Sequence, residues 1–175
     1  MAEILYRPPK VLYYLGIAEA VSRRSTCLRK HWGSVIVHND SIVSTGYNGA
    51  PRNCTNCSDT GRCYRMENHV ARGTQVEKCQ AVHSEQNAII MASADQMKGA
   101  TLFLYGYDCE TGTIVSNAGP CVICRRMIIN AGIQSVVVAD MNGFSKDHHP
   151  EQLYGYRVIR VADWLKNFDQ NDTGY

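Results

Sequence analysis

The sequence lacks several features that would assign it to a particular class of protein. Its formal net charge is only +2, and basic residues cluster only in RRSTCLRK, so it lacks the broad positive field of a nucleic-acid track. No apolar run approaches the roughly 20 residues that span a bilayer. The first ten residues, with Glu3, Pro8 and Pro9, lack the basic and apolar regions of a secretory signal. We therefore expect a cytoplasmic protein that acts on small ligands.

The chain also has no internal repeat and no low-complexity linker. Its 175 residues, 45% of them hydrophobic, suffice for one sizeable core and are too few for two. We expect a single domain over 1–175, with a polar, cysteine-rich insert at about 50–80. An insert of this length in a compact domain needs a cross-link or a function.

Local patterns predict alternating helices and strands. Apolar residues at helical spacing predict a helix after the two prolines that ends near Ser25, and two β-branched runs around Asn39-Asp40 predict a hairpin. The later elements are predicted as a helix over 83–94, a strand over 100–106, a turn excursion over 107–119, a helix over 121–131 closed by Gly132, a buried strand over 133–139, and a last strand over 155–161 before a short helix. The strand–helix–strand order predicts a parallel pair.

The chain has eight cysteines, and in a reducing compartment we do not expect them to form disulfides. Their spacing points instead to metal ligation or catalysis. Cys121 and Cys124 stand three apart directly after Pro120. At the start of a helix both sulfurs can reach one ion from the same side. The partial positive charge at a helix N-terminus also lowers thiol pKa, and the thiolate is the form that binds zinc.

His83 and Glu85 form the second notable pair. Residues two apart in a regular helix point about 200° away from each other, so His83 must lie at or before the first turn if both side chains serve one ion. One histidine and two thiolates give three zinc ligands, a number that leaves a position for water. The alternatives are a hydrogen-bonded core histidine, a first-turn acid favoured by the helix dipole, and half of a structural zinc knuckle.

The pattern H-x-E followed by P-C-x-x-C is the signature of zinc-dependent nucleobase deaminases. Together with RSTCLRKHWGSVIV, STGYNGAP and HSEQNAII, it resembles the deoxycytidylate (dCMP) deaminase family over Tyr14 to Asp140. The resemblance implies an α/β protein with a three-layer α/β/α cytidine-deaminase-like fold, in which helices cover both faces of a mixed five-stranded sheet. It also implies a homo-oligomer, such as a hexamer, that converts dCMP to dUMP in pyrimidine deoxynucleotide metabolism.

The chemistry of such a site can be argued from the residues. Zinc at His83, Cys121 and Cys124 would acidify a bound water, but two anionic thiolates reduce the charge of the ion, so a carboxylate is needed to take the proton. Glu85 is available because it is not a ligand. It would pass the proton to N3 of cytosine and later protonate the amine that leaves C4. Loss of such a base should cost about 10²- to 10⁴-fold in rate.

Candidate nucleotide contacts come from two stretches. By the resemblance, Asn48 of GYNG would hydrogen-bond the deoxyribose hydroxyl; alternatively, Asn48-Gly49 is only a tight turn. A 5′-phosphate requires positive charge and hydroxyl donors, for which we predict Arg29, Lys30 and Ser25. The alternative is a solvated helix C-terminus, where cations are favoured in any case.

A second, structural zinc is predicted in the insert, where four thiols suffice for a closed tetrahedral site. The resemblance adds Cys27 as a fifth candidate, because members of the family build such a site partly from the cysteine of an RSTC-like stretch. The five candidates for four positions are Cys27, Cys54, Cys57, Cys63 and Cys79. Unliganded loop cysteines are the alternative, and Cys109 is predicted to be one.

Three features depart from the family pattern. Ser84 replaces the usual alanine between His83 and Glu85. Asn53 replaces a usual glycine in the region where regulated members bind dCTP or dTTP, with magnesium as the expected counterion. The 106–119 segment separates the strand from Pro120 and would lie over the mouth of the active site. Other functions that fit the motifs are deamination of a nucleic-acid base, such as adenosine in tRNA, and a non-catalytic zinc-stabilised binding module.

Overall fold

The computed structural model describes residues 6–71, 73–143 and 153–166. Its centre is a six-stranded sheet in which β2, β1, β3, β5 and β6 are neighbours in that order, and β4 pairs with β3. The strands are β1 (Lys30–His38), β2 (Ser41–Tyr47), β3 (Thr101–Asp108), β4 (Thr113–Ile114), β5 (Ser135–Asp140) and β6 (Gly155–Arg160). The pair β3–β5 is parallel and the other pairs are antiparallel. The predicted mixed sheet is confirmed, with β4 as an additional short strand.

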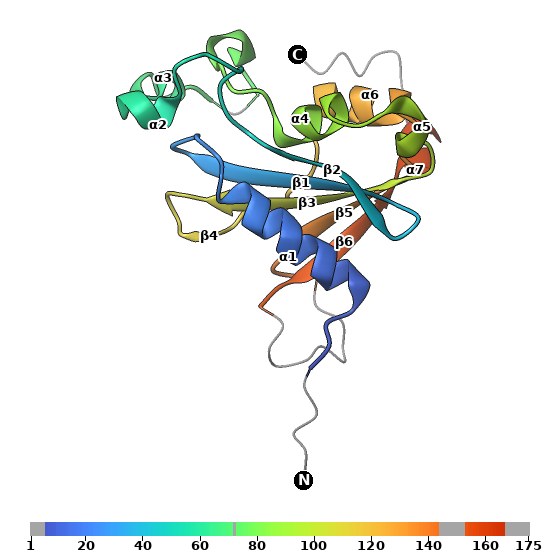
Figure 1. The fold of residues 1–175 in the computed structure, drawn as a ribbon. Coiled ribbons are helices and arrows are strands. Elements are labelled where there is room, and N and C mark those ends of the chain that lie inside the picture. The colour runs from blue at the N-terminus through green and yellow to red at the C-terminus, as the bar shows by residue number, and fades with distance from the viewer. Residues whose placement is uncertain (1–5, 72, 144–152, 167–175) are drawn as a thin grey trace.

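Helices cover both faces of this sheet, as the predicted three-layer arrangement requires (Figure 1). Helix α1 (Lys10–Ser22) lies on one face. The other face carries α4 (Ser84–Ile90), α5 (Ala94–Met97), α6 (Val122–Asn130) and α7 (Val161–Lys166). No helix in the described part of the chain is long and apolar enough to cross a membrane.

The central strands are buried on both faces, because their side chains alternate between two apolar clusters. On β1, Val35 and Val37 pack towards α1, whereas Ile36 packs towards α4 and α6. On β5, Val136 and Val138 belong to the α4 and α6 side, and Val137 to the α1 side. This alternation fixes which residues of β1 face the start of α4.

The β1–β2 hairpin turns where the sequence predicts. Asn39 and Asp40 have φ values of 48° and 61°, the left-handed pair that a tight two-residue hairpin turn needs and that asparagine and aspartate tolerate. The Tyr14 hydroxyl donates to Asp40 Oδ1 at 2.8 Å and so attaches the turn to α1.

Helix α4 lies unusually close to β2 because Gly46 has no side chain. A Cβ atom at this position would collide with the backbone of Ser84 and Ala88. The close approach is the reason for glycine here. The helix ends at Ile90 and a separate α5 begins at Ala94, so the single helix predicted over 83–94 is wrong in its C-terminal third.

The polar insert contains three short helical segments rather than irregular chain alone: α2 (Cys57–Thr60), α3 (Tyr64–Glu67) and η1 (Val76–Lys78). Arg65 organises it by donating to the carbonyls of Ala71 and Thr74, both at 2.7 Å. The Ser58 N–H donates to the Thr26 carbonyl at 3.2 Å. The insert is therefore attached to the chain just after α1.

The 106–119 segment begins as a hairpin in which Tyr107 pairs with Ile114. Gly112 takes the predicted turn position with φ 69°. The Cys109 N–H donates to the Arg29 carbonyl at 2.9 Å, and Val115 and Ala118 are buried in the core. The segment is thus part of the sheet and core, not a free loop, because β3 continues far enough to pair with the start of β1.

Candidate active site

Two helix starts meet on the face of the sheet opposite α1. His83 is the N-cap residue of α4, with extended backbone angles of −71° and 155°, and Cys121 is the N-cap residue of α6. Cys124 lies one turn into α6 and is fully buried. The prediction that His83 must precede the first helical turn is confirmed. The side chains of His83 and Glu85 can therefore serve one site.

The donor atoms of these residues have the spacing of a metal site. His83 Nδ1 lies 3.5 Å from Cys121 Sγ and 3.4 Å from Cys124 Sγ. Zinc bonds of about 2.0 Å to nitrogen and 2.3 Å to sulfur place tetrahedral donors about 3.5 Å apart. Among the described residues, this is the one group of three such side chains whose donor atoms all lie within 4.8 Å. One imidazole and two thiols at this spacing fit zinc.

The electrostatics of the centre favour a thiolate. A hydrogen bond from the Cys124 thiol, with further support from His83, lowers the pKa of Cys121 to about 4. The pKa of Cys124 is raised, because its proton is held against Cys121 and its sulfur is buried. The hydrogen bond to Cys121 in turn raises the pKa of His83. The three groups form one hydrogen-bonded cluster with a negative charge centred on sulfur.

Glu85 lies beside this cluster without belonging to it. Its side chain is almost wholly buried, and burial raises the pKa of its carboxyl group. Oε2 accepts a hydrogen bond from the Ser84 hydroxyl at 3.1 Å. The carboxylate is near enough to contribute to the raised pKa of Cys124. A buried carboxyl group of raised pKa next to a metal-binding cluster is suited to accept and return a proton.

The sequence matches the model of the cytidine and deoxycytidylate deaminase zinc-binding region over residues 9–140. The chain belongs to this deaminase family. The match includes all three donors of the centre and Glu85. The resemblance inferred from the motifs is confirmed.

Several relatives within the deaminase family are similar over most of this chain. The deoxycytidylate deaminase of Schizosaccharomyces pombe is 31% identical over 160 residues, which are 91% of this chain and 45% of the yeast protein. The deoxycytidylate deaminase of Mycobacterium phage D29 is 34% identical over 136 residues, covering 75% of this chain and 94% of the phage protein. The chain spans less than half the length of the yeast relatives it matches.

The fold is also that of a solved member of the family. The dCMP deaminase of cyanophage S-TIM5, in its complex with dCMP and dUMP, superposes with a TM-score of 0.53 and 28% identity. The superposition covers 75% of this chain and 82% of that chain. The cytidine-deaminase-like fold predicted from the motifs is confirmed.

Two of the predicted nucleotide contacts, Asn48 and Ser25, lie together beside the start of β1. Asn48 is buried, and its Oδ1 accepts from the Ser25 hydroxyl at 2.6 Å and from the Trp32 N–H at 2.8 Å. Its Nδ2 donates to the Lys30 carbonyl at 2.9 Å. An amide has two N–H donors, and the second has no partner among the described residues. Asn48 therefore brackets the start of β1 and retains one donor.

The cations at the end of α1 differ in their surroundings. Lys30 Nζ is 3.0 Å from Asp108 Oδ2, and Arg23 is paired with Glu19 at 3.1 Å. The guanidinium of Arg24 lies over the Tyr47 ring, 5.9 Å from its centroid. Arg29 makes no ion pair within the described ranges. Of the two cations predicted for the phosphate, Arg29 is thus the less occupied.

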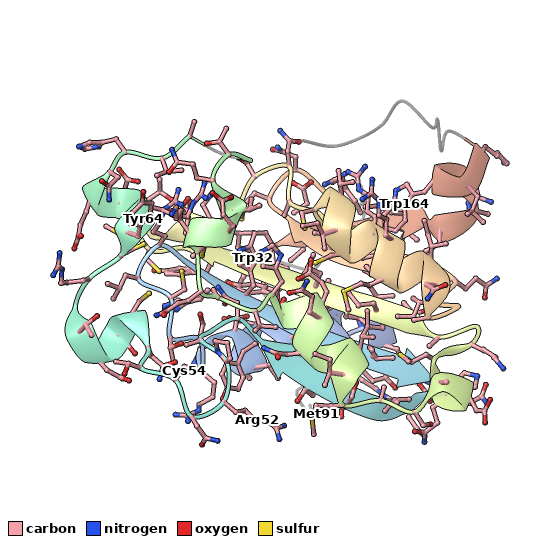
Figure 2. All side chains as sticks on the ribbon, turned by 90° about the horizontal axis from the view of Figure 1, so that it is seen from above. Trp32, Arg52, Cys54, Tyr64, Met91 and Trp164 are labelled. Atoms are coloured by element: carbon pink, nitrogen blue, oxygen red, sulfur yellow. The ribbon has the colours of Figure 1, made fainter. Side chains whose placement is uncertain are left out.

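The cysteines of the insert are not equivalent. Burial raises the pKa of the Cys57 thiol, and the nearby thiols of Cys63, Cys27 and Cys79 raise it further. Cys54 exerts no such effect and is exposed (Figure 2). Three of the other four candidates therefore lie near enough to Cys57 to act on its charge, although among the described residues no three of these sulfurs approach as closely as the donors around His83.

Two arginines that the motifs did not indicate hold the segment before Cys121. Arg125 Nε donates to the Pro120 carbonyl at 3.1 Å, and its guanidinium lies over the Trp164 ring. Arg157 donates to the Ala118 carbonyl and forms an ion pair at 2.6 Å with the buried carboxylate of Asp140. Arg125 directly follows the C-x-x-C motif, which is a usable signal. Arg157 gives none, because its partners are distant in the sequence.

Proposed function

We propose that the chain catalyses the hydrolytic deamination of a free cytosine nucleotide, dCMP to dUMP. The observation that carries the proposal is Glu85, a buried carboxyl of raised pKa beside a three-donor cluster that fits zinc. A binding module would not require this carboxyl. The names of the relatives support the choice of substrate.

In this mechanism His83, Cys121 and Cys124 hold the metal. Zinc bound there would supply a water molecule acidic enough to act as the nucleophile at neutral pH. Glu85 accepts the proton of that water and donates it to N3 of the cytosine ring as oxygen bonds to C4. It then takes the proton of the new hydroxyl group on C4 and passes it to the amine, which leaves as ammonia as the C4 carbonyl forms. The same carboxyl group thus acts as base and as acid in turn.

Substrate orientation is assigned to the residues at the start of β1. The remaining N–H of Asn48 would donate to the deoxyribose hydroxyl. Arg29 would contact the 5′-phosphate. Lys30 would join it only by giving up part of its pairing with Asp108, and Ser25 only by turning its hydroxyl proton away from Asn48. The proximity of Ser25 and Asn48 supports a common binding region.

The decisive experiment measures ammonia release from dCMP, CMP, cytidine, dCTP and a tRNA anticodon stem, with Glu85→Gln as the control. We expect release from dCMP and a loss of about 10²- to 10⁴-fold in the variant. Undiminished release by Glu85→Gln would refute the mechanism. Turnover of the tRNA stem alone would indicate a nucleic-acid deaminase, and turnover of none would indicate a binding module.

We further propose a structural zinc held by Cys27, Cys57, Cys63 and Cys79, with Cys54 left out. The influence of the Cys63, Cys27 and Cys79 thiols on the pKa of Cys57 supports this ligand set. Four thiolates complete a tetrahedral zinc site. Such a site would link the end of α1, the insert and the approach to α4. Cys109 is also close to Cys27, but it lies on the β3–β4 hairpin outside the insert.

We also propose regulation by dCTP or dTTP with magnesium, assembly into a homo-oligomer such as a hexamer, and a cytoplasmic location. Asn53 is compatible with an effector region that usually carries glycine, since its φ of 65° is a left-handed conformation that glycine adopts readily. The exposed Ile90 and Met91 at the end of α4 support self-association. Activity with added nucleotides and sedimentation velocity would test the first two points.

A further inference from the structure

A line of buried hydroxyl groups leads from the sheet to Glu85. The Ser34 hydroxyl on β1 donates to Ser84 Oγ at 2.8 Å, and the Ser84 hydroxyl donates to Glu85 Oε2 at 3.1 Å. Ser34 and Ser84 are fully buried, and Glu85 is 5% exposed. The three groups are therefore shielded from water that could replace any one of these bonds.

The order of donors in this line follows from the chemistry of a hydroxyl group. A serine has a single proton to donate, and Ser84 Oγ already accepts one from Ser34. The proton of Ser84 is thus directed to the carboxylate, and in a buried setting such bonds reinforce one another. Because Ser34 lies on a central strand, the line connects a flexible glutamate to the most rigid part of the fold.

We propose that Ser34 and Ser84 are positioning residues that hold the Glu85 carboxylate towards the reacting atoms. A glutamate at the start of a helix has three rotatable bonds, and proton transfer requires an approach within hydrogen-bond distance. Fixing Oε2 restricts rotation of the carboxylate and sets the direction of Oε1. This role rests on the proposed function, since it concerns the same proton-transfer group.

The kinetic test compares Ser84→Ala and Ser34→Ala with Ser44→Ala as the matched control. Ser44 is also a buried serine, and its hydroxyl donates to the Ala88 carbonyl of the same helix at 2.7 Å, without reaching Glu85. Alanine is the family's usual residue at position 84, so Ser84→Ala should remain active with dCMP as substrate and lower kcat by about tenfold, the low end of the range for one hydrogen bond to a charged group. The KM should stay within about twofold of the wild-type value, since the two serines position the group that transfers the proton and do not contact the substrate.

The other variants show whether Ser34 acts on Glu85 through Ser84. Ser34→Ala should lower kcat less than Ser84→Ala, and the double variant should be no slower than Ser84→Ala alone, because Ser34 acts through Ser84. Ser44→Ala should keep the wild-type kcat. A kcat within about twofold of the wild type in Ser84→Ala, or an equal loss in Ser44→Ala, would overturn the proposal. If Ser84→Ala fails to fold, the kcat of Ser34→Ala decides in the same way.

A second readout does not depend on turnover. The free energies of urea unfolding of the wild type, Ser84→Ala, Glu85→Gln and the double variant form a double-mutant cycle. If Ser84 holds the carboxylate, the two substitutions should change the unfolding free energy non-additively. Additive changes would overturn the proposal. If the wild type deaminates none of the substrates, the proposed function fails while this cycle still decides whether Ser84 holds Glu85.

Discussion

The pairing of Lys30 with Asp108 changes the role expected of Lys30 in phosphate binding. Lys30 is 35% exposed and Asp108 19% exposed, and their charged atoms are 3.0 Å apart. Asp108 belongs to the end of β3, which runs on into the 106–119 hairpin. A nucleotide phosphate would have to compete with this carboxylate for Lys30.

The first prediction at this scale separates the two predicted phosphate ligands. Arg29→Ala should raise KM for dCMP by about tenfold, as expected for the loss of one charge-assisted contact. Lys30→Ala should raise it less, because Asp108 already satisfies the ammonium group. Deoxycytidine has no phosphate and serves as the control, so its KM should be unaffected by either change. An equal effect on nucleotide and nucleoside would remove both residues from the phosphate site.

The same ion pair predicts how stability depends on pH. The hydrogen bond from Lys30 holds the pKa of Asp108 below its usual value near 4. A carboxyl with a lowered folded-state pKa contributes stability above its unfolded pKa, and the contribution is lost as pH falls through the folded value. Asp108→Asn should therefore be less stable than the wild type at pH 7, by about 1 kcal/mol or less for so exposed a pair.

Urea unfolding of the two proteins between pH 7 and pH 2 would test this prediction. The difference in unfolding free energy should shrink below about pH 4 and vanish once Asp108 is protonated in the folded wild type. A difference that stays constant with pH would show that the pair contributes through packing rather than charge.

At the scale of elements, the site depends on two helices that begin beside each other and on the C-terminal elements behind them. Trp164 of α7 lies next to α6, where it supports Arg125 (Figure 2). Arg125 and Arg157 hold the carbonyls of Pro120 and Ala118. The chain that leads into Cys121 is therefore fixed by α6 itself and by β6.

This arrangement predicts that Arg125→Ala weakens metal retention. Residues that orient metal ligands typically affect metal affinity by about 10- to 100-fold, and Arg125 acts one carbonyl away from Cys121. We expect zinc to be lost to a competing chelator at about tenfold lower chelator concentration. Lys98→Ala, which removes an exposed cation paired only at the surface with Asp95, should behave as the wild type. Equal retention in both variants would contradict the prediction.

At the scale of the whole molecule, the insert contacts the rest of the domain at few points. Besides the Ser58–Thr26 bond, the Arg52 guanidinium donates to the sulfur of Met91 at 3.0 Å, and an isolated bridge between Gly49 and Val82 closes the base of the insert. The helical segments of the insert are short, and none of their own residues is buried. Between them, Cys63 and Val70 are the buried residues of the described insert, too few for an apolar core to account for its order, so a metal cross-link is the physical alternative.

The corresponding prediction concerns metal content. Cys63→Ser should retain one of two zinc ions per chain and lower Tm by more than about 5 °C, because a structural zinc site contributes directly to folding free energy. Cys54→Ser should keep both ions and the wild-type Tm, since Cys54 is exposed and is not one of the four proposed zinc ligands. Elemental analysis and calorimetry would measure both effects. A single zinc in the wild type would exclude the structural site.

Much of the fold followed from local pattern. The turn at Asn39-Asp40, the helix closed by Gly132 and the buried strand over 135–140 each have a signal within a few residues. The break between α4 and α5 also had a local signal, the Ser93-x-x-Gln96 spacing of a helix start at Ser93, which the apolar spacing that continues across it obscured. The anchoring of the 106–119 hairpin lacked such a signal, since it depends on the register between β1 and β3.

By itself the sequence determined the chemistry of the centre: which side chains can ligate zinc, which acid can move protons, and that His83 must precede its helix. These follow from residue types and from the geometry of one helical turn. Tertiary structure alone decided which of the five candidate cysteines lie near Cys57, that Lys30 faces Asp108, and that Ser34 reaches Glu85 through Ser84. Each of these contacts joins residues distant in the sequence, and only the pairing and packing of the sheet bring them together.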